Sequence, residues 1–375
     1  MYTGGDQLQA AVDDMFGVER ETNKATLKVH RLSGIRELYL GTTGDYDFHG
    51  GYHRSRALLA NTGDFTGLVK NAMNKRVVQK WKQLGKEGYD WWMKIVAIEH
   101  FETLNDITGI LVGTVGTLPT VGEGEEYPEL AVGDSPETAA FFKQGGYIPL
   151  TLELIDRDET RKLKIYPDEL ASAYLRTLSS RIAGIFTQNS GAGPTMADGG
   201  ALFNATPATT VGGHQNLGTT PLSVTEWYVA SNAIFKQPLL IKTGAAYAGT
   251  GPRAGVRPKF NLIPNDLRKT ARDSFVNRWD TSDNKHSENL LAGEVEPVVV
   301  PDFTDATDWA AVVAPEVQPC IVLGERFGLL PEIYIAGSED NASVFENDTH
   351  RMKVRGFNAV LVQDHRGLYK ENVAG

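Results

Sequence analysis

The sequence predicts an α+β protein, and three features support this class. Apolar side chains recur at helical spacing over residues 64–85 and 167–189, which predicts two long amphipathic helices. Strand-like runs at 259–263, 295–300 and 351–363 do not alternate with helices in a βαβ rhythm. Glycine is abundant, at 39 of 375 residues, which indicates many turns and long excursions rather than a helical bundle.

The composition is that of a folded chain. Of 375 residues 41% are apolar and 22% are charged, so we expect two or three folding units. The net charge of −10 disfavours a protein that wraps nucleic acid with its whole surface. Cys320 is the single cysteine, which excludes an internal disulfide. No signal peptide and no run of roughly 18 apolar residues is visible, so we expect a soluble intracellular protein and no membrane partner.

The N-terminal segment predicts a short amphipathic turn over residues 8–16, followed by an extended arm through Gly41, Gly44 and Gly51. The helix over 64–85 then has an apolar face and a basic face. Such a basic face is either a solvated surface or a docking surface for an acidic partner.

An acidic partner is present in the same chain, because residues 96–150 carry nine acids and one base. This segment predicts a long hairpin, with a strand at 111–115, a tip at 133–136 and a return strand over 138–154. Two strands alone are marginal in water, so a neighbouring copy of the chain is the expected support. Opposite charge would fix the register of helix and hairpin. The predicted contacts between copies are Lys70, Lys75, Arg76, Lys80 and Lys82 on the helix, and Glu123, Glu125, Glu126, Glu129, Asp134, Glu137 and Lys143 on the hairpin.

The rest of the chain alternates irregularly between helices and strands. Pro167 fits the first position of its helix, and Ser223 with Glu226 forms a capping-box pattern. The further elements that we predict are a helix at 223–236, a strand at 259–263 with a helix at 266–279, strands at 295–300, 309–313, 319–322, 332–336, 351–355 and 357–363, and a turn at 364–367.

No catalytic or cofactor-binding constellation is predicted. The phosphate-loop, dinucleotide and G-x-S-x-G patterns are absent. Lys242-Thr243-Gly244 and Ser282-Asp283-Asn284 resemble the signature triplets of penicillin-recognising acyl transferases. Their order is inverted, however, and Ser282 cannot also serve as the nucleophile of the missing upstream motif.

No metal site is predicted either. His49 and His53 have an i,i+4 spacing, but Gly50-Gly51 between them argues against the helix that a shared ion would need. The remaining histidines form no cluster in the sequence. Cys320, flanked by proline and apolar residues, is expected to be an inert buried thiol.

A series of short motifs spans most of the chain in a specific order. They are Thr43-Gly44-Asp45, Ala72-Met73-Asn74-Lys75-Arg76, residues 116–124, Lys143-Gln144-Gly145-Gly146-Tyr147, Pro258-Lys259-Phe260-Asn261-Leu262-Ile263-Pro264, Val298-Val299-Val300-Pro301, Asp308-Trp309, Val354-Arg355-Gly356-Phe357 and residues 364–370. Together they resemble the major capsid protein of tailed bacteriophages, with the Hong Kong 97-type fold. More narrowly they resemble the Mu-like branch, whose capsid protein is often fused to a prohead protease.

The resemblance implies a Hong Kong 97-type capsid fold with named parts. These would be an N-terminal arm at 1–95, an extended β-hairpin loop at 96–150, a peripheral domain at 151–192 and 331–375 with a long spine helix at 167–189, and an axial domain at 193–330.

The resemblance also implies a function. The chain would be a structural protein of the virion, not an enzyme, that self-assembles in the host cytoplasm into hexamers and pentamers of an icosahedral shell around double-stranded DNA. Its partners would be itself, the packaged DNA without sequence-specific binding, and portal, scaffolding or decoration proteins. The alternatives are an encapsulin-like compartment, a ring-forming tail or neck component, or, in a different class, a soluble acyl-transfer hydrolase.

Overall fold

The computed structural model divides the chain into two compact units. The first comprises residues up to Gly85, Lys143–Arg176 and Phe327–Phe357, and the second comprises Lys86–Phe142, Thr177–Arg326 and Asn358–Gly375. The structure describes residues 5–18, 31–48, 63–84, 88–118, 120–121, 126–127, 129–157, 160–279, 288–336 and 349–374.

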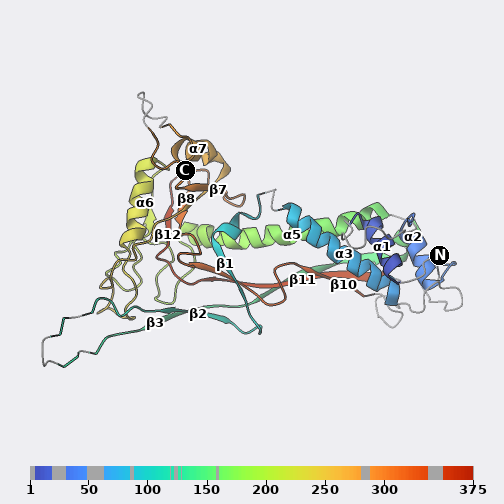
Figure 1. Ribbon diagram of the computed structural model, residues 1–375, viewed down its shortest axis with the longest axis horizontal. Coiled ribbons are helices and arrows are strands. Elements are labelled where there is room, and N and C mark those ends of the chain that lie inside the picture. Colours follow the sequence, from blue (N-terminus) through green and yellow to red (C-terminus); the bar gives the residue numbers. More distant parts are fainter. Residues whose placement is uncertain are drawn as a thin grey trace. The chain divides into compact units, whose positions relative to one another are not determined.

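Three helices of the first unit pack together (Figure 1). They are α1 (Gly5–Phe16), α2 (Ile35–Thr43) and α3 (Gly63–Leu84). The third confirms the predicted helix, and the first is longer than the amphipathic turn predicted over residues 8–16. The prediction of an extended arm is wrong over α2. Ile35, Leu38, Tyr39 and Thr42 are buried at helical spacing, so this segment gains a packed face by coiling.

The long helix α5 (Thr160–Thr187) begins at Thr160, so the prediction that Pro167 occupies its first position is wrong. Leu163 is fully buried, two helical turns before Leu170, and extends the apolar stripe towards the N-terminus. Proline removes one backbone hydrogen bond, and the helix continues on both sides of it.

Strands β4 (Phe142–Thr151) and β10 (Glu332–Ala336) both pair with β11 (Thr349–Val362). The two strands predicted at 351–355 and 357–363 are one continuous strand. The strand continues through Gly356, where the ring of Tyr174 packs directly against the backbone. A Cβ at this position would lie 2.3 Å from Cε2 of Tyr174, so glycine is needed for this close packing. After β4, Thr151 caps a short helix α4 (Leu152–Asp156) through Leu154 N–H.

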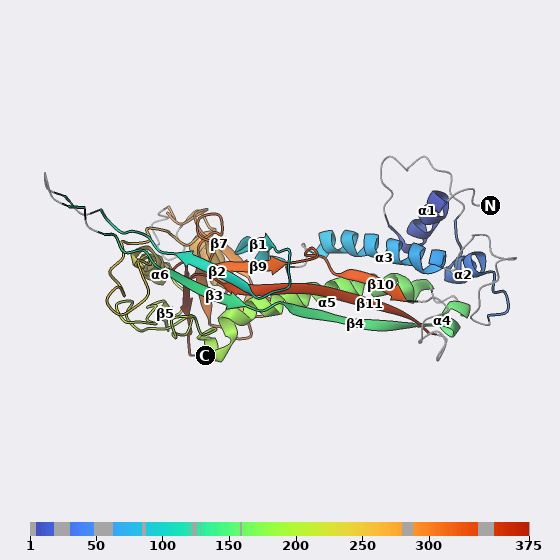
Figure 2. The same ribbon diagram turned by 90° about the horizontal axis from the view of Figure 1, so that it is seen from below.

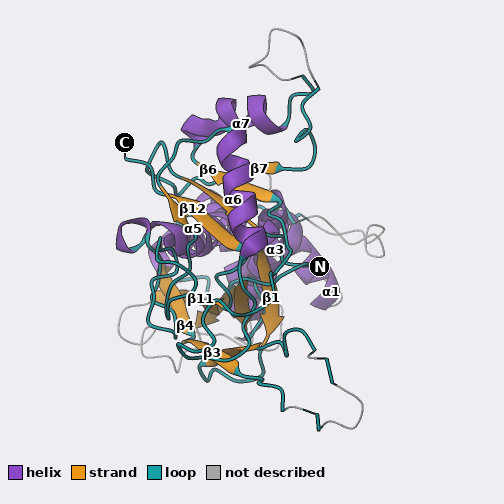
Figure 3. Cartoon of the chain, turned by 90° about the vertical axis from the view of Figure 1, so that its left-hand side faces the viewer, coloured by secondary structure: helices purple, strands orange, loops and turns teal. Residues whose placement is uncertain are grey.

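The second unit is built on a five-stranded sheet in the order β5-β12-β8-β6-β7, of which Figure 3 labels β12, β6 and β7. These strands are β5 (Leu217–Gly218), β6 (Phe260–Ile263), β7 (Glu296–Val299), β8 (Trp309–Val312) and β12 (Leu368–Glu371). Helices α6 (Val224–Lys236) and α7 (Arg268–Phe275) contribute to its core, in which the rings of Trp227 and Trp309 lie 6.2 Å apart.

The predicted cap of α6 is confirmed, since Ser223 Oγ accepts a hydrogen bond from Glu226 N–H. The helix predicted at 266–279 is shorter than expected: a 3₁₀ turn at Asn265–Leu267 precedes α7. Two other 3₁₀ turns lie at Trp91–Lys94 and Asn189–Gly191.

The second unit also holds the predicted hairpin. β1 (Val96–His100) and the C-terminal part of β11 flank β9 (Ile321–Glu325). β2 (Ile107–Val112) and β3 (Asp134–Ala139) form an antiparallel pair (Figure 2). Together with the helices, these sheets confirm the predicted α+β class.

The predicted tip of the hairpin is wrong. Val112 pairs with Asp134, so residues 133–136 begin the returning strand and the chain reverses between Gly113 and Gly133. Pro136 is tolerated because a strand of a two-stranded ribbon has one free edge. The predicted single return strand over 138–154 is in fact β3, β4 and α4, three separate elements.

Candidate assembly surface and buried polar clusters

The base of the β2–β3 hairpin is anchored to the rest of the second unit. Ile107 belongs to a buried apolar cluster with Val322 and Leu361. Further along, Thr114 N–H donates to the carbonyl of Leu240 at 2.7 Å, and Gly133 N–H donates to that of Ile241 at 2.8 Å. The expectation that the hairpin finds no support within its own chain is therefore wrong for its base.

Gly113 and Gly133 permit this close approach. A Cβ on Gly113 would lie 2.4 Å from the carbonyl oxygen of Ile241, and a Cβ on Gly133 would lie 2.7 Å from the Cα of Lys242. Both distances are far below van der Waals contact, so any larger residue would push the backbones apart.

Beyond this base the hairpin exposes large apolar side chains. Leu118 is 75% exposed and Tyr127 is 85% exposed. Val115, Leu130 and Val132 are also exposed in this part, and Ile110 and Val112 are exposed within β2. Several large exposed apolar side chains on one segment indicate a surface that is buried against another molecule.

Two of the predicted basic contact residues on α3 have acidic partners in the same unit. Lys75 Nζ lies 2.6 Å from Asp13. Arg76 binds Asp168 through two hydrogen bonds of 2.8 Å, and both side chains are about three-quarters buried. Hydrogen bonding to Asp168 raises the pKa of Arg76 although burial opposes it. These two cations therefore stabilise the subunit itself.

The other predicted contact residues have varied surroundings. Lys70 lies over the ring of Tyr334 at 4.5 Å, Lys80 is half-buried and Lys82 is exposed. On the hairpin, Glu137 accepts hydrogen bonds from Ala197 N–H at 2.9 and 3.0 Å. Glu126, Glu129, Asp134 and Lys143 are exposed, and Glu123 and Glu125 lie outside the described residues. Contacts between copies stay a prediction for the whole set.

A polar cluster that the sequence does not reveal lies in the second unit. His214 and His365 stack with ring centroids 3.7 Å apart, although the histidines form no cluster in the sequence. His214 Nε2 lies 2.9 Å from Asp198 Oδ2 and Nδ1 lies 3.0 Å from the carbonyl oxygen of Leu202. The two histidines are far apart in the chain, and no spacing rule connects them. His49 and His53, the pair weighed from sequence, lie outside the described residues.

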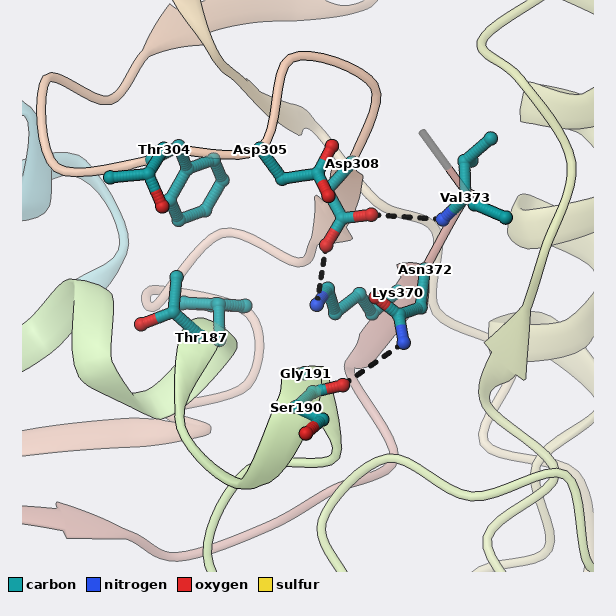
Figure 4. Close-up of a pocket in the computed structure, with 12 residues that line it drawn as sticks. Thr187, Ser190, Gly191, Thr304, Asp305, Asp308, Lys370, Asn372 and Val373 are labelled. Carbon is teal, nitrogen blue, oxygen red and sulfur yellow. Dashed lines mark hydrogen bonds and ion pairs between the residues drawn. The ribbon is translucent and has the colours of Figure 1, made fainter.

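A second cluster joins the C-terminal strand to the rest of its unit (Figure 4). Buried Lys370 forms a 2.8 Å ion pair with Asp308, which also accepts a hydrogen bond from Val373 N–H at 2.8 Å. Asn372 donates to the carbonyl of Ser190 at 3.0 Å. These residues line a cavity of about 460 Å³, and their contacts tie down the last residues of the chain.

Glu371, next to this cluster, is a fully buried carboxylic acid. Burial raises its pKa to about 7; a hydrogen bond from Thr220 N–H opposes the shift and the charge of Glu226 adds to it. Burial and the same carboxyl group raise the pKa of the neighbouring Tyr369. No sequence pattern predicts the burial of this group, because glutamate is rarely fully buried.

The thiol of Cys320 is buried as predicted, and burial raises its pKa well above the ordinary value. Of the two triplets that resemble acyl transferases, residues 282–284 lie outside the described residues. None of the helices in the described ranges is long and apolar enough to cross a bilayer.

Comparison with known proteins identifies the class of the chain. Residues 136–370, more than half of the sequence, match the family described as Phage capsid protein. The chain therefore belongs to the phage capsid protein family, and it is a structural protein of a virion. This confirms the predicted kinship with phage capsid proteins at the level of the family, whereas the Mu-like branch stays a prediction.

Three of the solved structures that are similar to this chain are described here. The chain from "Mycobacterium phage Bobi" is 13% identical, with 76% of this chain and 90% of that chain covered and a TM-score of 0.47. "The capsid of Myoviridae Phage XM1" shows 11% identity, coverage of 76% and 92% and a TM-score of 0.47. "Capsid of empty GTA particle computed with C5 symmetry" shows 12% identity, coverage of 76% and 90% and a TM-score of 0.47. None of the curated proteins searched matches the chain.

Proposed function

We propose that this capsid protein is the major head subunit, which assembles in the host cytoplasm into hexamers and pentamers of an icosahedral shell around double-stranded DNA. The observation that carries this proposal is the β2–β3 hairpin, whose base is anchored and whose outer part exposes large apolar side chains such as Leu118 and Tyr127. Each such side chain contributes about 1.5–3 kcal/mol when a neighbour buries it. A closed lattice of identical copies supplies that neighbour at every position.

The net negative charge of the chain supports a shell that binds its DNA only weakly. The net charge of −10 limits the number of phosphate contacts that the subunit can make. Weak, sequence-independent contact with DNA is what packaging and release require. Portal, scaffolding and decoration proteins are the further partners that a head of this class would need.

Electron microscopy of the purified chain tests the proposal. The unaltered protein should form closed shells, and the double variant Leu118→Ser with Tyr127→Ser should remain as folded, unassembled subunits. Leu290→Ser is the matched control, because Leu290 is 79% exposed in the second unit but outside the hairpin. Shells formed equally well by the double variant would contradict the role of the hairpin.

Charge on the hairpin gives a second test. Reversing Glu123, Glu125 and Glu126 to Lys should lower particle yield while the circular dichroism of the subunit is unchanged. A normal yield would count against charge pairing between copies.

A further inference from the structure

Both ring nitrogens of His214 face oxygen atoms. Its Nδ1 faces the carbonyl oxygen of Leu202, which can only accept, so Nδ1 carries a hydrogen. Its Nε2 faces Asp198 Oδ2 at 2.9 Å. The other oxygen of this carboxylate, Asp198 Oδ1, accepts a hydrogen bond from Gly200 N–H at 3.0 Å. Either a second proton or a metal ion must therefore lie at Nε2.

A third donor lies beside this pair. One potential ligand atom from each of Asp198, His214 and His365 falls within 4.8 Å of the others. Among the described residues, the ring nitrogens of His365 take part in no hydrogen bond. Histidine nitrogen is among the commonest ligands of metal ions in proteins.

We propose that Asp198, His214 and His365 form a binding site for a divalent transition-metal ion of the Zn²⁺ class. Zinc binds histidine nitrogen and carboxylate oxygen at about 2.0–2.2 Å, so two ligands of a tetrahedral site are about 3.4 Å apart. His214 Nε2 and Asp198 Oδ2 are 2.9 Å apart, so a separation about half an ångström larger would admit the ion. The bond from His214 Nδ1 to a carbonyl is the outer contact that typically orients a ligating histidine.

His365 completes the ligand set by a rotation of its side chain. In the structure its ring is stacked on that of His214, so its lone pairs do not converge with Nε2 on one point. Asp198 and His365 line a cavity of about 480 Å³, which gives the ring room to turn and admits water as a fourth ligand. Arg366 is paired with Asp364 at 2.9 Å, which offsets the charge that would otherwise repel a cation.

Such an ion would join segments that no covalent bond connects. Asp198 and His214 belong to a long loop between α5 and β5, and His365 belongs to the turn before β12. Cys320 is the single cysteine, so a disulfide cannot make this connection. The site lies next to Ala197, whose N–H donates a hydrogen bond to Glu137 on β3. The ion would therefore also make the loop that contacts the hairpin more rigid.

Metal analysis of the purified full chain tests the proposal. After incubation with Zn²⁺ and desalting, the protein should retain one equivalent, and its thermal unfolding midpoint should rise. Co²⁺ should give the intense visible absorption of a four-coordinate site. His365→Gln and Asp198→Asn should each weaken Zn²⁺ binding at least tenfold, which is the usual scale for loss of a ligand or its partner.

The controls separate this site from surface binding and from misfolding. His100→Gln removes an exposed histidine paired with Glu325 in the same unit and should leave Zn²⁺ binding unchanged. Asp198 is partly accessible, so Asp198→Asn keeps the protein folded if the buried histidine variants do not. Failure of the unaltered chain to retain Zn²⁺ or Co²⁺ would overturn the proposal, and a doubly protonated His214 seen by ¹⁵N NMR in the presence of Zn²⁺ would do the same.

Discussion

The buried carboxyl group of Glu371 makes the stability of the second unit depend on pH. Its pKa rises from 4.5 to about 7 in the folded protein. Between these two values the folded chain keeps a proton that the unfolded chain has lost. Stability due to this group is therefore highest at acidic pH, falls as the pH rises from about 4.5 to 7, and is constant above that. At about 1.4 kcal/mol per pH unit, the loss is about 3 kcal/mol.

The variant Glu371→Gln should remove this loss. The amide keeps an oxygen that can accept the hydrogen bond from Thr220 N–H, but it has no charge to bury. At pH 8 the variant should be more stable than the unaltered chain by about 3 kcal/mol, and near pH 5 the two should be nearly equal. The readout is guanidinium unfolding of unassembled subunits, followed by the fluorescence of Trp227 and Trp309 in the same core.

The control is Glu294→Gln, which removes an exposed acid of the same unit and should change stability little at any pH. A stability difference for Glu371→Gln that does not depend on pH, or a variant that is less stable at pH 8, would refute the reasoning.

Three further predictions follow from packing. Arg76→Ala should destabilise the first unit by about 2 kcal/mol in urea unfolding, because it leaves the largely buried carboxylate of Asp168 without its two charged hydrogen bonds; an unchanged midpoint would contradict this. Gly133→Ala should speed hydrogen exchange at the base of the hairpin, since the new Cβ would lie 2.7 Å from the Cα of Lys242, and equal exchange rates would show that the contact yields freely. Cys320 should react with a thiol reagent in denaturant but not in the folded protein at neutral pH; rapid native labelling would mean that the site opens.

Local patterns in the sequence determined much of this protein. The apolar period predicted α3 and the core of α5, and Ser223 with Glu226 placed the start of α6. A segment with nine acids and one base predicted a hairpin that needs a partner, although its base is anchored within the chain. The order of short motifs indicated the capsid family, which the match over residues 136–370 confirms. Each of these patterns involves residues only a few positions apart in the chain, so the amino-acid sequence is enough to recognise it.

Tertiary structure decided the features that depend on distant partners. Helix α2 contains glycine and threonine, which are weak helix formers. It forms because the coiled segment buries one face in the packed core. The ladder from Ile107 to Val112 set the length of the hairpin, and contact with Ile241 fixed its base. His214 and His365 meet, and Glu371 loses water, because the sheet and loops of the second unit bring separate segments to one point. Burial sets the pKa of Glu371, and long-range contact brings the two histidines together. Neither effect can be predicted from residues that are close together in the sequence.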